Sequence, residues 1–184
     1  HSDVYACRQT GFAMLCETNT QEVMDLSPVA HLATIEGKVP FINFFDGFRT
    51  SHEIQKIEKW DYADLKEMCN MEAVKAFRDH ALNPEHPAMR GSHENGDVFF
   101  QHREACNPVY DALPAIVEKY MNKVNEKLGT NYSLFNYYGA EDADRVIVAM
   151  GSINDVAEEV IDYRTAKGEK VGLIKVRLYP PWVA

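Results

Sequence analysis

Residues 46–53 hold the densest group of chemically active side chains in the sequence. Carboxylates, a guanidinium, hydroxyls and an imidazole follow one another there, in the order Asp46-Gly47-Phe48-Arg49-Thr50-Ser51-His52-Glu53. This segment comes directly after an apolar run, and ligands of parallel α/β sheets bind beyond the carboxyl ends of the strands. Loops this rich in functional groups are typical of binding sites. We expect Asp46, Arg49, Thr50 and His52 to lie near a cofactor or substrate, or at an interface between domains.

Arg49 is well suited to hold an anion, because a planar guanidinium can donate two parallel hydrogen bonds to a carboxylate or phosphate. The same side chain can instead pair with Asp46 or Glu53 and take no part in chemistry. The sequence leaves both alternatives open.

Arg8 and Thr10 are two further candidates, located just before the first apolar run, residues 11–16. At the amino end of a strand they would lie away from the ligand side of the sheet. If the true strand lies before residue 1, they would instead belong to a carboxyl-end loop. We therefore keep Arg8 and Thr10 as candidates near a cofactor or substrate.

The histidines and cysteines form no metal-binding pattern. The histidines of the central segment are irregularly spaced, at His80, His86, His93 and His102, whereas metal ligands must converge. The cysteines lie far apart, at Cys7, Cys16, Cys69 and Cys106, without the close pairs of zinc or iron–sulfur sites. We predict no metal site in this chain and reduced cysteines, as in a cytoplasmic protein.

Phosphate-binding signatures are also weak. Gly151-Ser152 lies between a predicted strand and a predicted helix, where backbone N–H groups can bind an anion, but one glycine is little evidence. The complete dinucleotide fingerprint, the P-loop and the Gly-x-Ser-x-Gly elbow are absent.

Two strand–helix–strand units explain how these residues are positioned. Residues 11–16 and 39–45 predict buried strands, joined by a helix that Thr18 and Gln21 would cap and Gly37 would end. A second unit comprises strand 145–150, helix 155–166 and strand 171–178. Such units imply parallel sheets, so the predicted fold class is α/β.

The residues between these units predict helices and one long loop. Asp61 and Asn70 would cap helices over 62–69 and 71–82, and residues 83–97 read as a loop. Asn107-Pro108 would start a long helix that Pro114 kinks or restarts and Gly129 ends. A strand is predicted over 132–138, and the acidic segment 139–144 predicts a domain boundary, which gives domains 1–139 and 140–184.

The composition is that of a globular protein: 46% of the 184 residues are hydrophobic and 26% are charged. A formal net charge of −9, with scattered basic residues, argues against nucleic-acid binding. No apolar run is long enough to cross a bilayer, so we predict no membrane partner. The first residue is not Met, and the opening reads as mid-loop, so we expect a piece of a longer chain.

Two stretches resemble pyruvate:ferredoxin (flavodoxin) oxidoreductases: DVYACRQTGFAML, from Asp3, and PFINFFDGFRTSHEIQKIE, from Pro40. Two later ones, NPEHP and KGEKVGLIKVRLYPP, are similar to the same family in the same order. The resemblance implies a thiamine-diphosphate-binding domain of the transketolase-like pyrimidine type over 1–139. It further implies the start of a second, transketolase-C-like α/β domain over 140–184.

The family resemblance implies an activity, oxidative decarboxylation of pyruvate to acetyl-CoA with coenzyme A. Its implied cofactors are thiamine diphosphate, Mg²⁺ and [4Fe-4S] clusters, and its electron partner is ferredoxin or flavodoxin. The family's activating glutamate and substrate-side threonine and arginine match positions before residue 1, and its cluster cysteines match positions after residue 184. No catalytic residue is therefore assigned here.

We expect this segment alone to be inactive, to bind none of these cofactors tightly, and to be marginally stable or a homo-oligomer, because an incomplete sheet exposes an edge. The alternatives are a related 2-oxoacid oxidoreductase, an NADP-linked pyruvate enzyme, or a docking segment without catalysis.

Overall fold

The computed structural model describes residues 2–91 and 93–183. The first predicted unit is present: β1 (Ala13–Cys16), α2 (Thr20–Gly37) and β2 (Phe41–Phe44) follow one another. β1 and β2 pair in parallel, with Ala13 opposite Phe41. The α/β fold class with a parallel sheet is thus confirmed.

The start of α2 differs from the prediction by one residue. Asn19, rather than Thr18, is the N-cap, and its side-chain oxygen accepts a hydrogen bond from Glu22 N at 3.0 Å. Glu22 reaches back to accept one from Thr18 N at 2.8 Å. This reciprocal arrangement satisfies backbone donors that the first turn of a helix leaves unpaired, and it leaves the Thr18 hydroxyl free for another partner.

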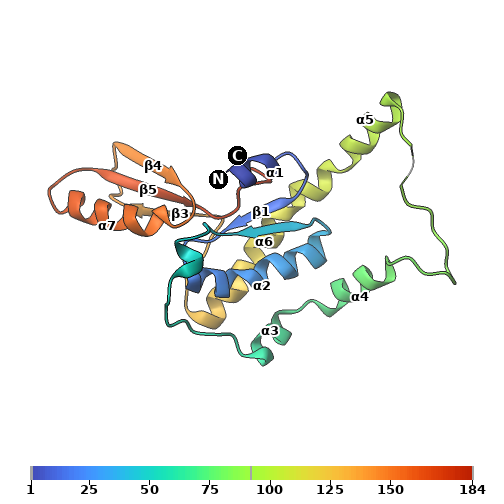
Figure 1. Cartoon of the computed structure of the whole chain (residues 1–184), viewed down its shortest axis with the longest axis horizontal. Coiled ribbons are helices and arrows are strands. Elements are labelled where there is room, and N and C mark those ends of the chain that lie inside the picture. Colours follow the sequence, from blue (N-terminus) through green and yellow to red (C-terminus); the bar gives the residue numbers. More distant parts are fainter. Residues whose placement is uncertain (1, 92, 184) are drawn as a thin grey trace.

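Five further helices surround this unit or extend from it (Figure 1). Their bounds are α1 (Ser2–Cys7), α3 (Tyr62–Met68), α4 (Met71–Asp79), α5 (Gly96–Ala105) and α6 (Asn107–Leu128), with a short 3₁₀ turn, η1 (Thr50–His52). The predicted caps Asp61 and Asn70 are confirmed. The helices α1 and α5 were not predicted, and α4 ends before residue 82.

The long helix α6 is continuous from Asn107 to Leu128, so the predicted restart at Pro114 was wrong, whereas the alternative, a kink there, stays a prediction. Its N-cap is Cys106 rather than Asn107. α6 packs along α2, and Leu113 and Val117 are fully buried on either side of the proline. This packing offsets the backbone hydrogen bond that a helical proline removes.

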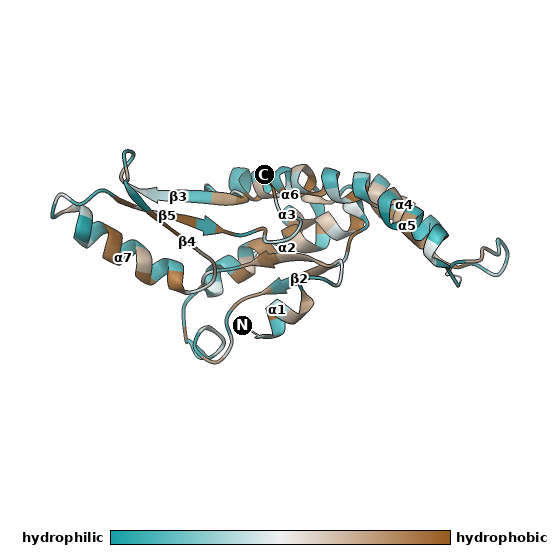
Figure 2. Cartoon of the chain, turned by 90° about the horizontal axis from the view of Figure 1, so that it is seen from above, coloured by the Kyte–Doolittle hydropathy of each residue, from teal (hydrophilic) through white to brown (hydrophobic). Residues whose placement is uncertain are grey.

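The second unit is also present, as β4 (Arg145–Ala149), α7 (Ile153–Thr165) and β5 (Val171–Val176). β4 and β5 are parallel, but β3 (Phe135–Gly139) joins β5 in antiparallel pairing, which gives the order β3-β5-β4. In Figure 2 the ribbon of β5 is mostly apolar, whereas β3 is mostly polar. The boundary predicted at 139/140 falls between two strands of this sheet, and the division into domains stays a prediction.

The chain passes from the second sheet to the first directly after β5. Cys16 N donates to Arg177 O at 2.8 Å, and Tyr179 N donates to Met14 O at 3.0 Å. Residues 177–180 therefore run along the free edge of β1, where Leu15 and Leu178 form an antiparallel bridge. This crossing places the Arg177 side chain beside the carboxyl end of β1.

The main hydrophobic core lies between the first sheet and the helices α2 and α6. It contains buried residues from all three, among them Leu15, Leu26, Val29, Met121 and Val124. A smaller cluster, formed by Ala157, Ile161 and Leu173, joins α7 to β5. Between these two cores lie several hydrogen bonds and an ion pair.

Candidate functional site

The polar residues between the two cores meet at the carboxyl ends of β1 and β2, beside the start of α7. We call this group the polar interface. Its members are Glu17, Thr18, Glu22, Asp46, Thr50, Ser152, Asn154 and Arg177. It is the place where the α/β fold predicts a ligand site.

Asp46 connects the first sheet to α7. Its Oδ1 accepts a hydrogen bond from Ser152 N at 3.1 Å, and its Oδ2 accepts one from the Thr50 hydroxyl at 3.0 Å. Partial burial of the carboxylate raises the pKa, but the hydrogen bonds from Ser152 and Thr50 outweigh that effect, so the pKa of Asp46 lies below its usual value. Asp46 therefore acts as a charged cap for α7.

The other two candidates of this loop are exposed, and their side chains contact other residues of the same loop. Arg49 is 71% exposed, with its Nε 3.8 Å from Glu53 Oε1. His52 is also exposed, and its ring lies 5.3 Å from that of Phe48. The structure thus divides the four predicted residues into a hydrogen-bonded pair that fixes the loop, the partly buried Asp46 and the buried Thr50, and an exposed pair that can contact another molecule.

Arg8 and Thr10 lie at the opposite, amino end of β1. They follow α1 and bond back to it: Arg8 donates to Tyr5 O at 2.8 Å, and Thr10 donates to Cys7 O at 2.6 Å. β1 begins after them, so the structure does not bring them together with the residues of the 46–53 loop.

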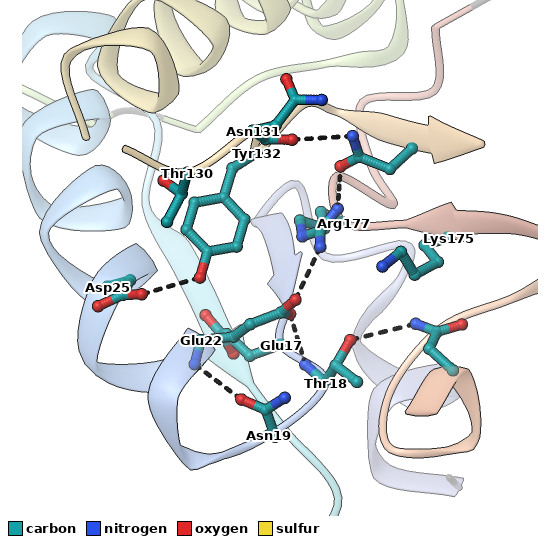
Figure 3. A network of polar contacts seen from close by, with 12 residues as sticks. Glu17, Thr18, Asn19, Glu22, Asp25, Thr130, Asn131, Tyr132, Lys175 and Arg177 are labelled. Atoms are coloured by element: carbon teal, nitrogen blue, oxygen red, sulfur yellow. Dashed lines mark hydrogen bonds and ion pairs between the residues drawn. The ribbon is translucent and has the colours of Figure 1, made fainter. Parts of the chain in front are cut away.

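A buried ion pair forms the centre of the polar interface (Figure 3). Arg177 Nη2 lies 2.7 Å from Glu22 Oε1, and the two side chains are 4% and 10% exposed. Nearby, Asn154 Nδ2 donates to the Thr18 hydroxyl at 3.2 Å. Sequence reasoning missed this network because its partners lie more than a hundred residues apart in the chain.

Glu17 is the most unusual residue of the polar interface. It is fully buried, and neither carboxylate oxygen has a hydrogen-bond partner among the described residues. Burial, reinforced by the nearby charge of Glu22, raises the pKa of Glu17 to about 9. Burial, together with the nearby carboxylates of Glu17, Glu22 and Asp46, raises the pKa of the neighbouring Cys16 thiol to about 12. At neutral pH Glu17 is therefore a neutral acid, and its position directly after a buried strand was the one sequence signal for it.

The polar interface does not fit thiamine diphosphate on its own. A diphosphate needs cationic or N–H donors, but Asp46 already occupies the start of α7 and Glu22 already pairs with Arg177. In the part of the chain that the structure describes, no three His, Cys, Asp or Glu side chains are grouped to hold a metal ion. We therefore derive no chemical step through the cofactor here.

Within residues 2–91 and 93–183, no helix is both long enough and apolar enough to span a membrane.

Comparison with known proteins assigns the chain to a class of protein. Residues 1–122 match the family model described as pyruvate flavodoxin/ferredoxin oxidoreductase, thiamine diphosphate-binding, and residues 143–182 match pyruvate:ferredoxin oxidoreductase core domain II. A solved 2-oxoglutarate:ferredoxin oxidoreductase from Magnetococcus marinus superposes with a TM-score of 0.51 at 18% identity, over 92% of this chain and 31% of that chain. This similarity supports the α/β fold.

The chain belongs to the pyruvate flavodoxin/ferredoxin oxidoreductase family. It is 57% identical over 182 residues to the pyruvate-flavodoxin oxidoreductase of Enterobacter agglomerans, covering 99% of this chain. It is also 57% identical over 184 residues to the pyruvate:ferredoxin oxidoreductase of Moorella thermoacetica, covering 100% of this chain. In both cases it spans only 16% of the relative's length.

Proposed function

We propose that this chain is the part of a pyruvate oxidoreductase that joins its thiamine-diphosphate-binding domain to the following α/β domain. The complete enzyme would oxidatively decarboxylate pyruvate and form acetyl-CoA with coenzyme A. Its electrons would pass through [4Fe-4S] clusters to ferredoxin or flavodoxin, and Mg²⁺ would accompany the thiamine diphosphate. The identity of 57% along the whole chain is the observation that carries this proposal.

The role of the chain's own residues is to position other groups. Asp46 and Thr50 hold the 46–53 loop against α7, and the Glu22–Arg177 pair holds residues 177–180 against β1. Arg49 and His52 remain exposed on the same loop, where they can contact the cofactor, the substrate or a neighbouring domain. Arg8 and Thr10, at the other end of β1, would contact a different neighbour.

A chimeric enzyme tests this proposal. In the Moorella thermoacetica enzyme, the corresponding 184 residues would be replaced by this chain, and pyruvate-dependent reduction of ferredoxin would be measured. We expect an assembled enzyme with turnover within about tenfold of the unaltered one, because a sequence this similar preserves the fold. The unaltered enzyme, expressed in parallel, is the control. An assembled chimera that binds thiamine diphosphate but does not oxidise pyruvate would contradict the proposal.

Arg49→Ala in the same chimera distinguishes catalysis from docking. A loss of turnover with unchanged assembly would favour a contact with the substrate or cofactor, whereas loss of assembly would favour a docking role. Lys56→Ala, which removes another exposed cation from the next segment, is the matched control.

The electron acceptor is not defined by these residues, since flavodoxin-linked and ferredoxin-linked relatives are equally similar to the chain. An NADP-linked pyruvate enzyme or a related 2-oxoacid oxidoreductase remains the second candidate. Reduction of NADP by the complete protein would favour the NADP-linked form.

A further inference from the structure

A large groove lies between α2 and the segment that follows η1, away from the polar interface. Its volume is about 820 Å³, which is within the range of small-molecule sites. Its walls are largely apolar, with contributions from Val23, Met24, Pro28, Ile57, Trp60 and Leu65. None of the residues assigned above to the polar interface except Thr50 lines it.

The outer wall of this groove, residues 53–61, lacks regular secondary structure but is fastened to the first half of α2. The Thr20 hydroxyl donates to Gln55 Oε1 at 2.6 Å. Gln21 makes two hydrogen bonds to the backbone of Glu58, accepting from its N–H at 2.8 Å and donating to its carbonyl at 3.1 Å. This segment is therefore a fixed wall rather than a loose loop.

A third hydrogen bond between this wall and α2 depends on a proline inside α2. Pro28 has no N–H, so the carbonyl four residues earlier, that of Met24, lacks its helical donor. Trp60 Nε1 supplies the missing hydrogen bond at 2.9 Å. The indole ring is thereby held against the groove that it lines together with Pro28.

Among the charged side chains that line the groove, the acidic one has partners and the basic ones have none among the described residues. Glu53 is neutralised locally, because it lies 3.8 Å from Arg49 and accepts a hydrogen bond from Gln55 Nε2 at 2.9 Å. Lys59 and His31, both exposed, make no ion pair or side-chain hydrogen bond with any other residue that the structure describes. Lys59 thus places an unpaired positive charge at the edge of an apolar groove, which favours an anionic occupant there although the chain as a whole carries a net charge of −9.

We propose that this groove binds an amphipathic organic monoanion, a small molecule with an apolar or aromatic body and a single carboxylate or sulfonate at one end. The body packs between Pro28 and Trp60, and the anionic end lies at Lys59, with His31 as a further donor. This inference does not depend on the catalytic assignment.

Fluorescence titration with anilinonaphthalene sulfonate tests the proposal on the whole chain. The chain has two tryptophans, so a Trp182→Phe background leaves Trp60 as the only indole reporter. We expect saturable quenching of Trp60 with one dye bound per chain. Lys59→Gln should raise the Kd about three- to tenfold, as expected for losing one partly exposed charge contact.

Two controls make the result specific. Lys56→Gln, three positions away and outside the groove lining, should leave the Kd unchanged. N-phenylnaphthylamine, which has the same aromatic body without the sulfonate, should bind more weakly than the anion. Circular dichroism would verify that each variant is folded.

Three outcomes would overturn the proposal. Equal affinities for Lys59→Gln and Lys56→Gln, or for the charged and uncharged dyes, would remove the anionic requirement. Dye fluorescence without quenching of Trp60 would place binding on another apolar surface. In the absence of dye, the Trp60 indole could become less accessible to solvent as the protein concentration rises. That result would show that a second copy of the chain, and not a small molecule, occupies the groove.

Discussion

Glu17 shows how a single carboxylate can make stability depend on pH. Its pKa is about 9 in the folded chain, compared with an ordinary value of 4.5. Between these values the folded chain keeps a proton that the unfolded chain releases. The contribution of Glu17 to the free energy of unfolding is therefore greatest below about pH 4.5. This contribution is lost as the pH rises toward 9.

Replacing Glu17 by Gln removes this penalty while preserving the shape of the side chain. We expect Glu17→Gln to stabilise the fold at neutral pH by on the order of 3 kcal/mol, and by less near about pH 5. Urea unfolding at several pH values measures the difference. The control is Glu126→Gln, an exposed change on α6. A difference in unfolding free energy between Glu17→Gln and the original chain that stays the same at every pH would contradict this prediction. It would show that Glu17 is ionised in the folded chain.

The candidate residues were predictable only in part. Asp46 and Thr50 stand out because they follow a buried strand, and the structure places them at its carboxyl edge. Glu22 and Arg177 could not be paired from the sequence, since the contact depends on how the chain crosses from β5 to β1. Long-range packing, rather than local pattern, makes the polar interface.

At the scale of elements, both strand–helix–strand units were predictable because apolar runs and caps recur in order. β3 was placed in the sequence as a strand, but its antiparallel pairing with β5 was not foreseen. α5 was missed because Gly96 and the preceding polar residues favour a loop. α6 continues through Pro114 because its packing on α2 outweighs local propensity.

The hydrogen bond between Trp60 and the Met24 carbonyl should depend on Pro28. In the original chain, Trp60→Phe leaves that carbonyl without its donor and should cost about 1 kcal/mol. In a Pro28→Ala background the cost should be smaller, because the backbone N–H that the alanine restores can form the helical bond instead. Urea unfolding of the two single variants and the double variant measures this coupling. Strictly additive effects would show that the proline does not create the acceptor.

At the scale of the whole molecule, one exposed apolar surface lies on β4, at an edge of the second sheet. Val146, Ile147 and Val148 are 43%, 53% and 61% exposed, and β4 has a paired strand on one side only among the described residues. α4 and α5 form a second exposed region, extending away from both sheets (Figure 1). Unpaired strand edges of this kind favour association.

We expect the isolated chain to self-associate through β4. Light scattering during gel filtration should give a mass above the 20.9 kDa of one chain, and Val148→Lys should shift the population toward the monomer by placing a charge on the edge. Val109→Lys, at an exposed position on α6, is the matched control. A monomeric original chain that unfolds cooperatively at high dilution would show that the edge is harmless.

The central claim is that this chain positions other parts of an enzyme and is not itself a cofactor site. Calorimetric titration of the purified chain with thiamine diphosphate and Mg²⁺ tests it most directly. We predict no saturable heat, because the start of α7 is already capped by Asp46 and Arg177 is already paired with Glu22. Saturable binding of one thiamine diphosphate per chain would contradict this account and place a working cofactor site within these residues.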